Sequence, residues 1–155
     1  MEYLDHLDFK ILNALQLDNM TSQRDIGNEI GLSAPAVQRR IKRLREIGAI
    51  QGDVSILNPD YLGSPITIVV QVEMETDKIE QINKVKAKFK TTPQVQQCFY
   101  VTGQTDFVLV IVVYTMKEYE ALTHDLFFNN PDIKQFNTSI AMDIVKTGLA
   151  IPLPK

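Results

Sequence analysis

The sequence SQRDIGNEIGLSAPAVQRRIKRLREIGAI, residues 22–50, decides the fold of the first part of this chain. Its pattern predicts two helices joined by a tight turn. Ser22 is suited to begin the first helix, with Asp25 three residues later in a capping-box arrangement. Gly31 can adopt the left-handed conformation that ends a helix, and Ser33 is suited to cap the next helix. This pattern is typical of a helix-turn-helix.

The second helix of this pair has an apolar side and a basic side. Val37, Ile41 and Leu44 recur at helical spacing, and Pro35 is tolerated because it falls in the first turn. Residues 34–47 have a local charge of +4, from five basic residues against one acidic residue: Arg39, Arg40, Lys42, Arg43 and Arg45 against Glu46. The sequence therefore predicts that this helix presents a positive face to solvent or to a partner.

Another helix is expected before the pair and a short hairpin after it. Apolar residues at helix-face spacing run from Leu4 to Leu15, and Asp18-Asn19 breaks that helix. A hairpin around Gln51-Gly52-Asp53, within residues 49–57, would form a wing. We therefore expect a winged helix-turn-helix domain over residues 1–52, followed by a linker and hinge strand over residues 53–65.

From residue 66 onward the apolar period changes from helical to alternating. The expected strands are residues 66–74, 95–102, 107–114 and 133–145, and the third is nearly all apolar and therefore central. The expected helices begin at Asp77 and at Met116. Their inward residues are Ile79, Ile82, Val85 and Phe89 in one helix, and Met116, Tyr119, Leu122 and Leu126 in the other. The order βαββαβ predicts a ferredoxin-like sandwich over residues 66–155, and an α+β fold class overall.

Composition restricts the kinds of protein that this chain can be. It has 155 residues, a net charge of −3 and one cysteine, which excludes an intramolecular disulfide and favours a cytoplasmic location. We expect no signal peptide, because the stretch MEYLDHLDFK is acidic and lacks an apolar region, and the longest apolar run is too short to span a membrane as a helix. We expect Cys98 to be a small buried hydrophobe. His6 and His124 lack metal-ligand spacing, so no metal site is expected.

A helix-turn-helix places its second helix in the major groove of double-stranded DNA. The residues expected to face base edges are those that begin this helix: Ala34, Pro35, Ala36, Gln38 and Arg39. Gln38 can pair with adenine and Arg39 with guanine. Phosphate contacts are expected from Ser33, Arg40, Lys42, Arg43 and Arg45, and Ser22 is a further candidate DNA-binding residue. The alternative is a solvated basic face on a helical bundle.

Two longer stretches resemble the Lrp/AsnC (feast/famine) regulators of bacteria and archaea. They are LDFKILNALQLD, and the run from Ser22 through the LNPDYLG segment that ends at Gly63. A TGxxDF loop at residues 102–107 is also similar to that family. Two departures are Gln51, where the family commonly has a basic residue, and the stretch at residues 52–55. These departures put a phosphate contact near the wing in doubt.

The resemblance implies a dimer formed through the sandwich sheets, with further assembly, for example into octamers. It also implies that a free amino acid binds between dimers beside the loop Thr102, Gly103, Gln104, Thr105 and Asp106, with Thr138 and Ser139 facing the same region. The chemistry of the loop agrees, because Gly103 permits close backbone approach and Asp106 can pair with an α-ammonium group. Tyr100 and Ile140 would line the side-chain pocket. The alternative is an ordinary hairpin turn.

The sequence therefore predicts a sequence-specific DNA-binding transcription regulator whose assembly or DNA binding responds to an amino acid. Its partners would be double-stranded DNA, other copies of the chain and the free amino acid, with no cofactor and no membrane. One alternative is an architectural DNA-binding protein with weak effector control. Another is a small-molecule enzyme on a ferredoxin-like fold, although the sequence has no paired acid and base and no cofactor motif.

Overall fold

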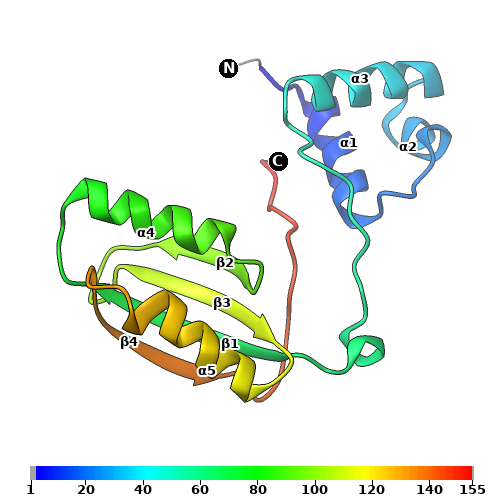
Figure 1. The fold of residues 1–155 in the computed structure, drawn as a ribbon. Helices are drawn as coiled ribbons and strands as arrows, with labels where there is room; N and C mark the ends of the chain where they lie inside the picture. Colours follow the sequence, from blue (N-terminus) through cyan, green and yellow to red (C-terminus); the bar gives the residue numbers. More distant parts are fainter. Residues whose placement is uncertain (1–2, 155) are drawn as a thin grey trace. The chain divides into compact units, whose positions relative to one another are not determined.

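The computed structural model describes residues 3–154, which form two compact units (Figure 1). One unit contains the residues up to Ile56 together with those from Lys146 onward, and the other contains Leu57–Val145. The first two residues of the expected DNA-binding domain and the last residue of the expected sensor domain lie outside the described residues.

The described residues of the first unit form three helices, α1 (His6–Leu17), α2 (Gln23–Ile30) and α3 (Ala34–Glu46). The Ser22 side chain accepts a hydrogen bond from the Asp25 backbone N–H at 3.1 Å and so begins α2 as predicted. Gly31 ends α2 with φ of 75°, which a residue with a side chain rarely adopts. The helix-turn-helix is therefore confirmed.

Ser33 occupies the capping position of α3, but its hydroxyl makes no capping hydrogen bond within residues 3–154. The two amides that such a hydroxyl normally meets are not available. Pro35 has no N–H, and the Ala36 N–H donates to the Ser33 carbonyl at 2.9 Å. The expectation of a side-chain cap was wrong for this physical reason, and the exposed Ser33 hydroxyl is left for another partner.

The core of the first unit is small and is drawn from all three helices. Its buried apolar residues are Ile11, Ile26, Val37, Ile41 and Leu44. Gly27 of α2 lies so close to the turn that a Cβ added to it would stand 2.4 Å from the Leu32 carbonyl oxygen. A glycine is therefore required where α2 meets the start of α3.

The wing expected around Gln51-Gly52-Asp53 is not formed, because the described residues before β1 contain no strand. Val54 and Ile56 are exposed, and Asp53 pairs with Arg45 of α3 at 2.8 Å. The segment then leads to a 3-10 turn, Pro59–Leu62, begun by the Asn58 side chain. A hairpin needs two runs that can pair, and this short segment supplies only one.

The second unit has the predicted βαββαβ order. Its elements are β1 (Ile66–Met74), α4 (Ile79–Thr91), β2 (Val95–Tyr100), β3 (Phe107–Val113), α5 (Met116–Thr123) with a π-helical turn (His124–Phe128), and β4 (Ile133–Ile140). The strands form one antiparallel sheet in the order β2-β3-β1-β4, so β3 is a central strand as predicted. The α+β, ferredoxin-like fold is confirmed.

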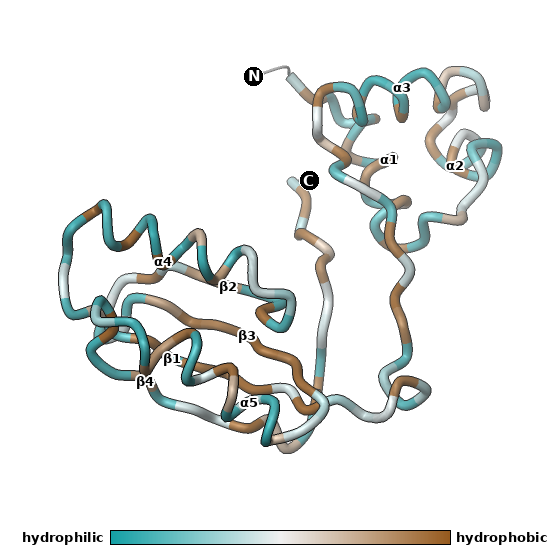
Figure 2. Tube along the Cα trace, in the orientation of Figure 1, coloured by the Kyte–Doolittle hydropathy of each residue, from teal (hydrophilic) through white to brown (hydrophobic). Residues whose placement is uncertain are grey.

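The apolar core of this unit lies between the sheet and its two helices. Alternate side chains of β1 and β3 are buried there, from Ile68 to Met74 and from Phe107 to Val113, and both strands carry the apolar colour in Figure 2. Phe89 of α4 packs edge-to-face on Phe107, with ring centroids 5.4 Å apart. The opposite face of the sheet is not covered by any described helix.

Five expectations about single positions in this unit were wrong. Helix α4 begins after Lys78 and not at Asp77, and Ile79 is 76% exposed because it lies in the first turn, beyond the edge of the core. Met116 likewise begins α5 and is 44% exposed. Strand β4 ends at Ile140 and not at residue 145, and the Ala141 N–H makes one further hydrogen bond to the Thr67 carbonyl of β1 at 2.9 Å. Cys98 is exposed because β2 is an edge strand.

Candidate DNA-binding and effector sites

The face of α3 that points away from the helical core carries the residues predicted to read bases. Pro35, Gln38, Arg39 and Lys42 are exposed on this face, because the buried Val37, Ile41 and Leu44 hold the opposite side. The small residues Ala34 and Ala36 are half-buried at the start of the helix. Small side chains here would let the helix backbone approach a groove closely, with Gln38 and Arg39 projecting farthest.

Arg40 and Arg43 lie on a different side of α3, against α1. Asp8 of α1 is completely buried, and Arg40 donates to its Oδ1 at 2.8 Å while Arg43 donates to its Oδ2. Arg40 also contacts Asp5 Oδ2 at 2.9 Å. The hydrogen bonds to Asp8 and Asp5 raise the pKa of Arg40. A buried carboxylate needs such partners, so these two arginines hold α3 on α1.

The remaining basic residues of α3 differ in how far they are neutralised. Lys42 lies 3.8 Å from Glu46, and Arg45 lies 2.8 Å from Asp53, with all four side chains largely in water. Arg39 forms no ion pair within the described part of the chain. Arg39 is therefore the basic group of α3 that is most available to a partner.

One exposed cation of the helix-turn-helix was not singled out from the sequence. Arg24 lies in the first turn of α2, next to the helix start at Ser22. The Ser22 hydroxyl also contacts the Asp25 carboxylate at 2.6 Å, which leaves that hydroxyl less free for a phosphate. The sequence could have indicated Arg24 by its position at the start of α2. This helix is the first of the helix-turn-helix pair, and in helix-turn-helix proteins that helix crosses the DNA backbone.

The loop between β2 and β3 is tied to β1 by its own polar groups. The Thr105 hydroxyl donates to the Val72 carbonyl at 2.7 Å, and the Asp106 N–H donates to the same oxygen at 2.9 Å. Asp106 Oδ2 accepts the Met74 N–H at 2.7 Å. Gly103 has φ of 126°, a conformation open to glycine. Asp106 therefore shapes the loop, and its Oδ1 forms no hydrogen bond within residues 3–154.

A polar pocket of about 450 Å³ lies where this loop meets the uncovered face of the sheet. Its lining residues are Gln71, Glu73, Gln104, Thr105, Gln135 and Asn137. The register places Gln71 opposite Asn137 and Glu73 opposite Gln135. Hydrogen bonds from Lys134 and Gln135 hold the Glu73 carboxylate and lower its pKa. We call these six residues the polar corner.

The polar corner contains two residues that the sequence predicted and four that it did not. Gln104 and Thr105 were expected from the loop. The sequence did not identify the four strand residues as a site. The alternation of polar and apolar residues assigns each of them to one face of the sheet, but which of them meet depends on the pairing of β1 with β4. The signal was present in the polar side chains that alternate with the apolar ones along β1.

The other predicted effector residues do not all meet at this pocket. Thr138 pairs with the buried Val70 and contacts the Tyr119 hydroxyl of α5 at 2.6 Å, so it faces the helices. Ser139 faces the opposite side, because successive strand residues alternate. Tyr100 and Ile140 are opposite the buried Phe107 and Ile68, on the helix side. These residues therefore divide between the two faces of the sheet.

The described part of the chain has neither a cluster of metal-binding side chains nor a helix that could cross a membrane. Within residues 3–154, no group of three His, Cys, Asp or Glu side chains is arranged to hold a metal ion. No helix among these residues has the length and apolar character needed to cross a membrane.

Comparison with known proteins places both units in one family. Residues 4–45 match the AsnC-type helix-turn-helix domain, and residues 67–151 match the Lrp/AsnC ligand binding domain. An uncharacterised HTH-type transcriptional regulator of Sinorhizobium fredii, y4tD, is 40% identical over 97% of this chain and 89% of its own length. The leucine-responsive regulatory protein of Haemophilus influenzae is 32% identical over 92% of this chain and 86% of its own.

A solved structure agrees with these sequence matches. The AsnC family transcriptional regulator from Agrobacterium tumefaciens has a TM-score of 0.86 and 27% identity, covering 96% of this chain and 97% of that chain. The helix-turn-helix, the sandwich and the order of the two along the chain are thus shared with known regulators. This chain belongs to the Lrp/AsnC family and is a DNA-binding transcription regulator.

Proposed function

We propose that this regulator reads DNA with the exposed face of α3 and responds to a free amino acid bound at the polar corner. The observation that supports the second part is the polar corner itself, where loop and strand residues line one pocket. The relative from Haemophilus influenzae is named for its response to leucine. We place the protein in the cytoplasm, where it would meet both DNA and free amino acids.

In this proposal the residues of the helix-turn-helix divide into three groups. Gln38 and Arg39 read base edges, supported by their exposure and by the absence of an ion pair on Arg39 within residues 3–154. Phosphate contacts come from Ser33, Lys42, Arg45 and Arg24 and fix the register. Arg40 and Arg43 act indirectly, because they hold α3 against Asp8.

The DNA part is tested by comparing Arg39→Ala with Lys42→Ala on operator DNA and on random DNA. If Arg39 reads a base, Arg39→Ala should lose about 1–3 kcal/mol of binding free energy on the operator and little on random DNA. If Lys42 binds a phosphate, Lys42→Ala should weaken binding to both DNAs to a similar extent. It should also lower the slope of log affinity against log salt concentration by about one. Equal losses on both DNAs for Arg39→Ala would remove it from base reading.

The amino acid would be held by groups of opposite character. Amide N–H groups of Gln104, Gln71 and Asn137 can donate to its carboxylate, and the Glu73 carboxylate can accept from its ammonium group. Asp106 Oδ1 is a further acceptor beside the loop. Because the pKa of Glu73 is lowered by Lys134 and Gln135, its charge is retained at neutral pH.

A thermal-shift screen of the twenty amino acids identifies the effector, since a ligand of the folded state raises the melting temperature. Calorimetry then compares Gln104→Ala with Asn83→Ala, an exposed amide of α4 outside the pocket. We expect about a tenfold loss of affinity in the first variant and none in the second. Unchanged affinity in Gln104→Ala would place the effector elsewhere.

We also propose that the uncovered face of the sheet joins two chains, and that dimers assemble further, up to octamers. Valines at positions 69, 108, 110 and 112 are only partly covered there, and Phe99 is 51% exposed. A dimer with two-fold symmetry would present two helix-turn-helix units to DNA and so double the base contacts that one unit makes. Light scattering of Val110→Asp should then show a monomer, whereas Asn83→Ala should keep the parent's mass.

A further inference from the structure

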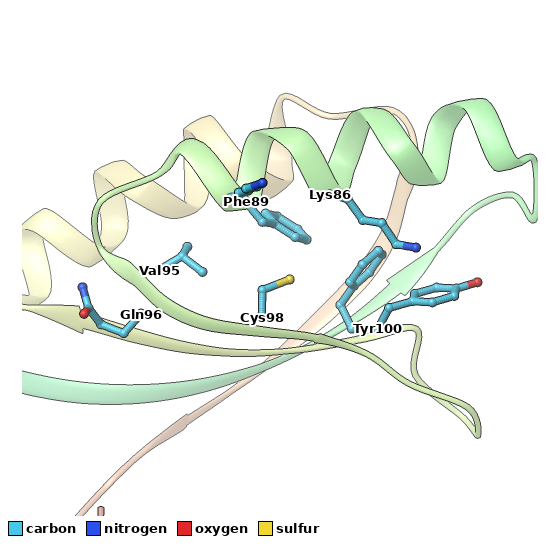
Figure 3. Close-up of a pocket in the computed structure, with 8 residues that line it drawn as sticks. Lys86, Phe89, Val95, Gln96, Cys98 and Tyr100 are labelled. Atoms are coloured by element: carbon cyan, nitrogen blue, oxygen red, sulfur yellow. The ribbon is translucent and has the colours of Figure 1, made fainter. Parts of the chain in front are cut away.

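A second pocket lies on the helix side of the sheet, between α4 and the edge strand β2 (Figure 3). Its volume is about 370 Å³. Cys98 and Tyr100 point into it from β2, since they pair with Leu109 and Phe107, whose side chains are buried under the helices. This pocket and the polar corner are therefore on opposite faces of the sheet.

The floor of this pocket is apolar and fully buried. Phe89 and Phe107 are both completely buried, and they pack edge-to-face. Val95 lies at the start of β2, where a bulge between Val95 and Gln97 interrupts the pairing with β3. The apolar surface that a ligand in this space could cover belongs to Val95, Cys98 and the Tyr100 ring, since Phe89 and Phe107 lie beneath them.

The rim of the pocket is positively charged. Lys86 and Lys90 are four residues apart on α4 and both line the pocket, whereas no acidic residue lines it. Neither lysine has an ion-pair partner among residues 3–154, although their neighbour Lys88 pairs with Asp125 at 2.7 Å. Lys86 Nζ lies 4.1 Å from the centre of the Tyr100 ring, which fixes the ammonium group above the pocket.

We propose that this pocket binds a small organic anion, a carboxylate that carries an apolar or aromatic group. Lys86 and Lys90 would bind the carboxylate, and Val95, Cys98 and the Tyr100 ring would contact the apolar part above the buried rings. A zwitterionic amino acid is disfavoured here, since its ammonium group would face two lysines and no acid. The proposal is independent of the effector site at the polar corner.

Cys98 provides a direct measure of occupancy, because it is the only cysteine of the chain and lines the pocket. The side chains around this exposed thiol partly desolvate it and so raise its pKa. Labelling by iodoacetamide, a neutral reagent, is therefore compared at one fixed alkaline pH. The probes are phenylacetate and phenethylamine, which have similar shape and opposite charge.

We expect phenylacetate to slow the labelling of Cys98 in a saturable way, by about tenfold at ten times its dissociation constant, because only the empty pocket reacts. Phenethylamine should have no effect. The variants Lys86→Met and Lys90→Met should lose the protection, and Lys84→Met, an exposed lysine of α4 outside the pocket, should keep it. As a control for the fold, the melting curves of all variants should match that of the parent.

Three results would overturn the proposal. They are equal protection by both probes, protection that survives in Lys86→Met and Lys90→Met, and no protection by phenylacetate at about 10 mM, where even a millimolar ligand is largely bound. The variant Gln104→Ala separates this site from the polar corner. It should lose amino-acid affinity and keep the protection of Cys98, so either proposal can fail without the other.

Discussion

The two units of the molecule have cores of different chemistry. The sandwich buries fourteen apolar residues between its sheet and helices. Among its described residues, the helix-turn-helix unit buries five apolar side chains, together with the completely buried carboxylate of Asp8. Small units bury less apolar surface, so single polar contacts carry more of their stability. The orientation of α3 should therefore depend on an ion-pair cluster, whereas the sandwich should depend on packing.

The largest effect is expected where the sandwich loses packing. Phe89→Ala removes a completely buried ring that contacts Phe107 and Phe127. The variant should lose about 4 kcal/mol of sandwich stability, through lost burial and the cavity left behind. Hydrogen exchange resolved by residue measures this loss, and amides of the first unit should keep their protection. Equal loss in both units would show that they unfold together.

A somewhat smaller effect is expected where the helical unit loses its ion-pair cluster. Asp8→Ala leaves Arg40 and Arg43 without their buried partner and should cost about 3 kcal/mol, since both arginines still reach water in part. DNA affinity should fall as well, because α3 loses its support. The matched control is Asp125→Ala, which breaks the exposed pair with Lys88 and should cost less than about 1 kcal/mol.

A change at Gly27 tests the packing of the helical unit without altering its charges. Gly27→Ala would place a methyl group 2.4 Å from the backbone oxygen of Leu32, so the turn between α2 and α3 must move. We expect a loss of about 2 kcal/mol by urea unfolding. In Gly52→Ala the added methyl meets nothing within 4 Å, so little change is expected. A stable Gly27→Ala protein would mean that this turn is easily displaced.

The smallest effect is a pH dependence at the edge of the ion-pair cluster. The Asp8 backbone N–H and then Arg40 hold the pKa of Asp5 below its ordinary value of 3.8. A group whose pKa is lower in the folded state than in the unfolded state contributes its full stabilisation at pH values above the unfolded-state pKa. This contribution is lost as the pH falls through the folded-state pKa. The difference in unfolding free energy between the parent and Asp5→Asn should therefore be constant at neutral pH and shrink below pH about 4.

The sequence predicted the elements of this fold because helix caps and apolar periods are local signals. Ser22 marks the start of α2 and Gly31 marks its end, and the near-continuous apolar run of β3 identified a central strand. Local signals were insufficient at edges. Cys98 sits in a strand of mixed character, and its exposure follows from the position of β2 at the edge of the sheet.

The same division applies to the sites. The exposed positions of Gln38 and Arg39 follow from helical periodicity, which the sequence contains. The pairing of Arg40 and Arg43 with Asp8 does not follow from helical periodicity. These arginines are 32 and 35 residues away from Asp8 in the sequence and meet it only when α1 packs on α3. A helical wheel shows the direction of a side chain, but it does not show which helix lies there.

The polar corner and the lysine-rimmed pocket are results of tertiary structure alone. Strand register brings Glu73 to Gln135, and sheet order leaves β2 at an edge beside α4. The sequence by itself determined the helix-turn-helix, the βαββαβ order and the residues that face outward on α3, since these depend on neighbours along the chain. Which charges are neutralised and which side chains share a pocket depends on contacts between distant segments, and only the folded chain decides these.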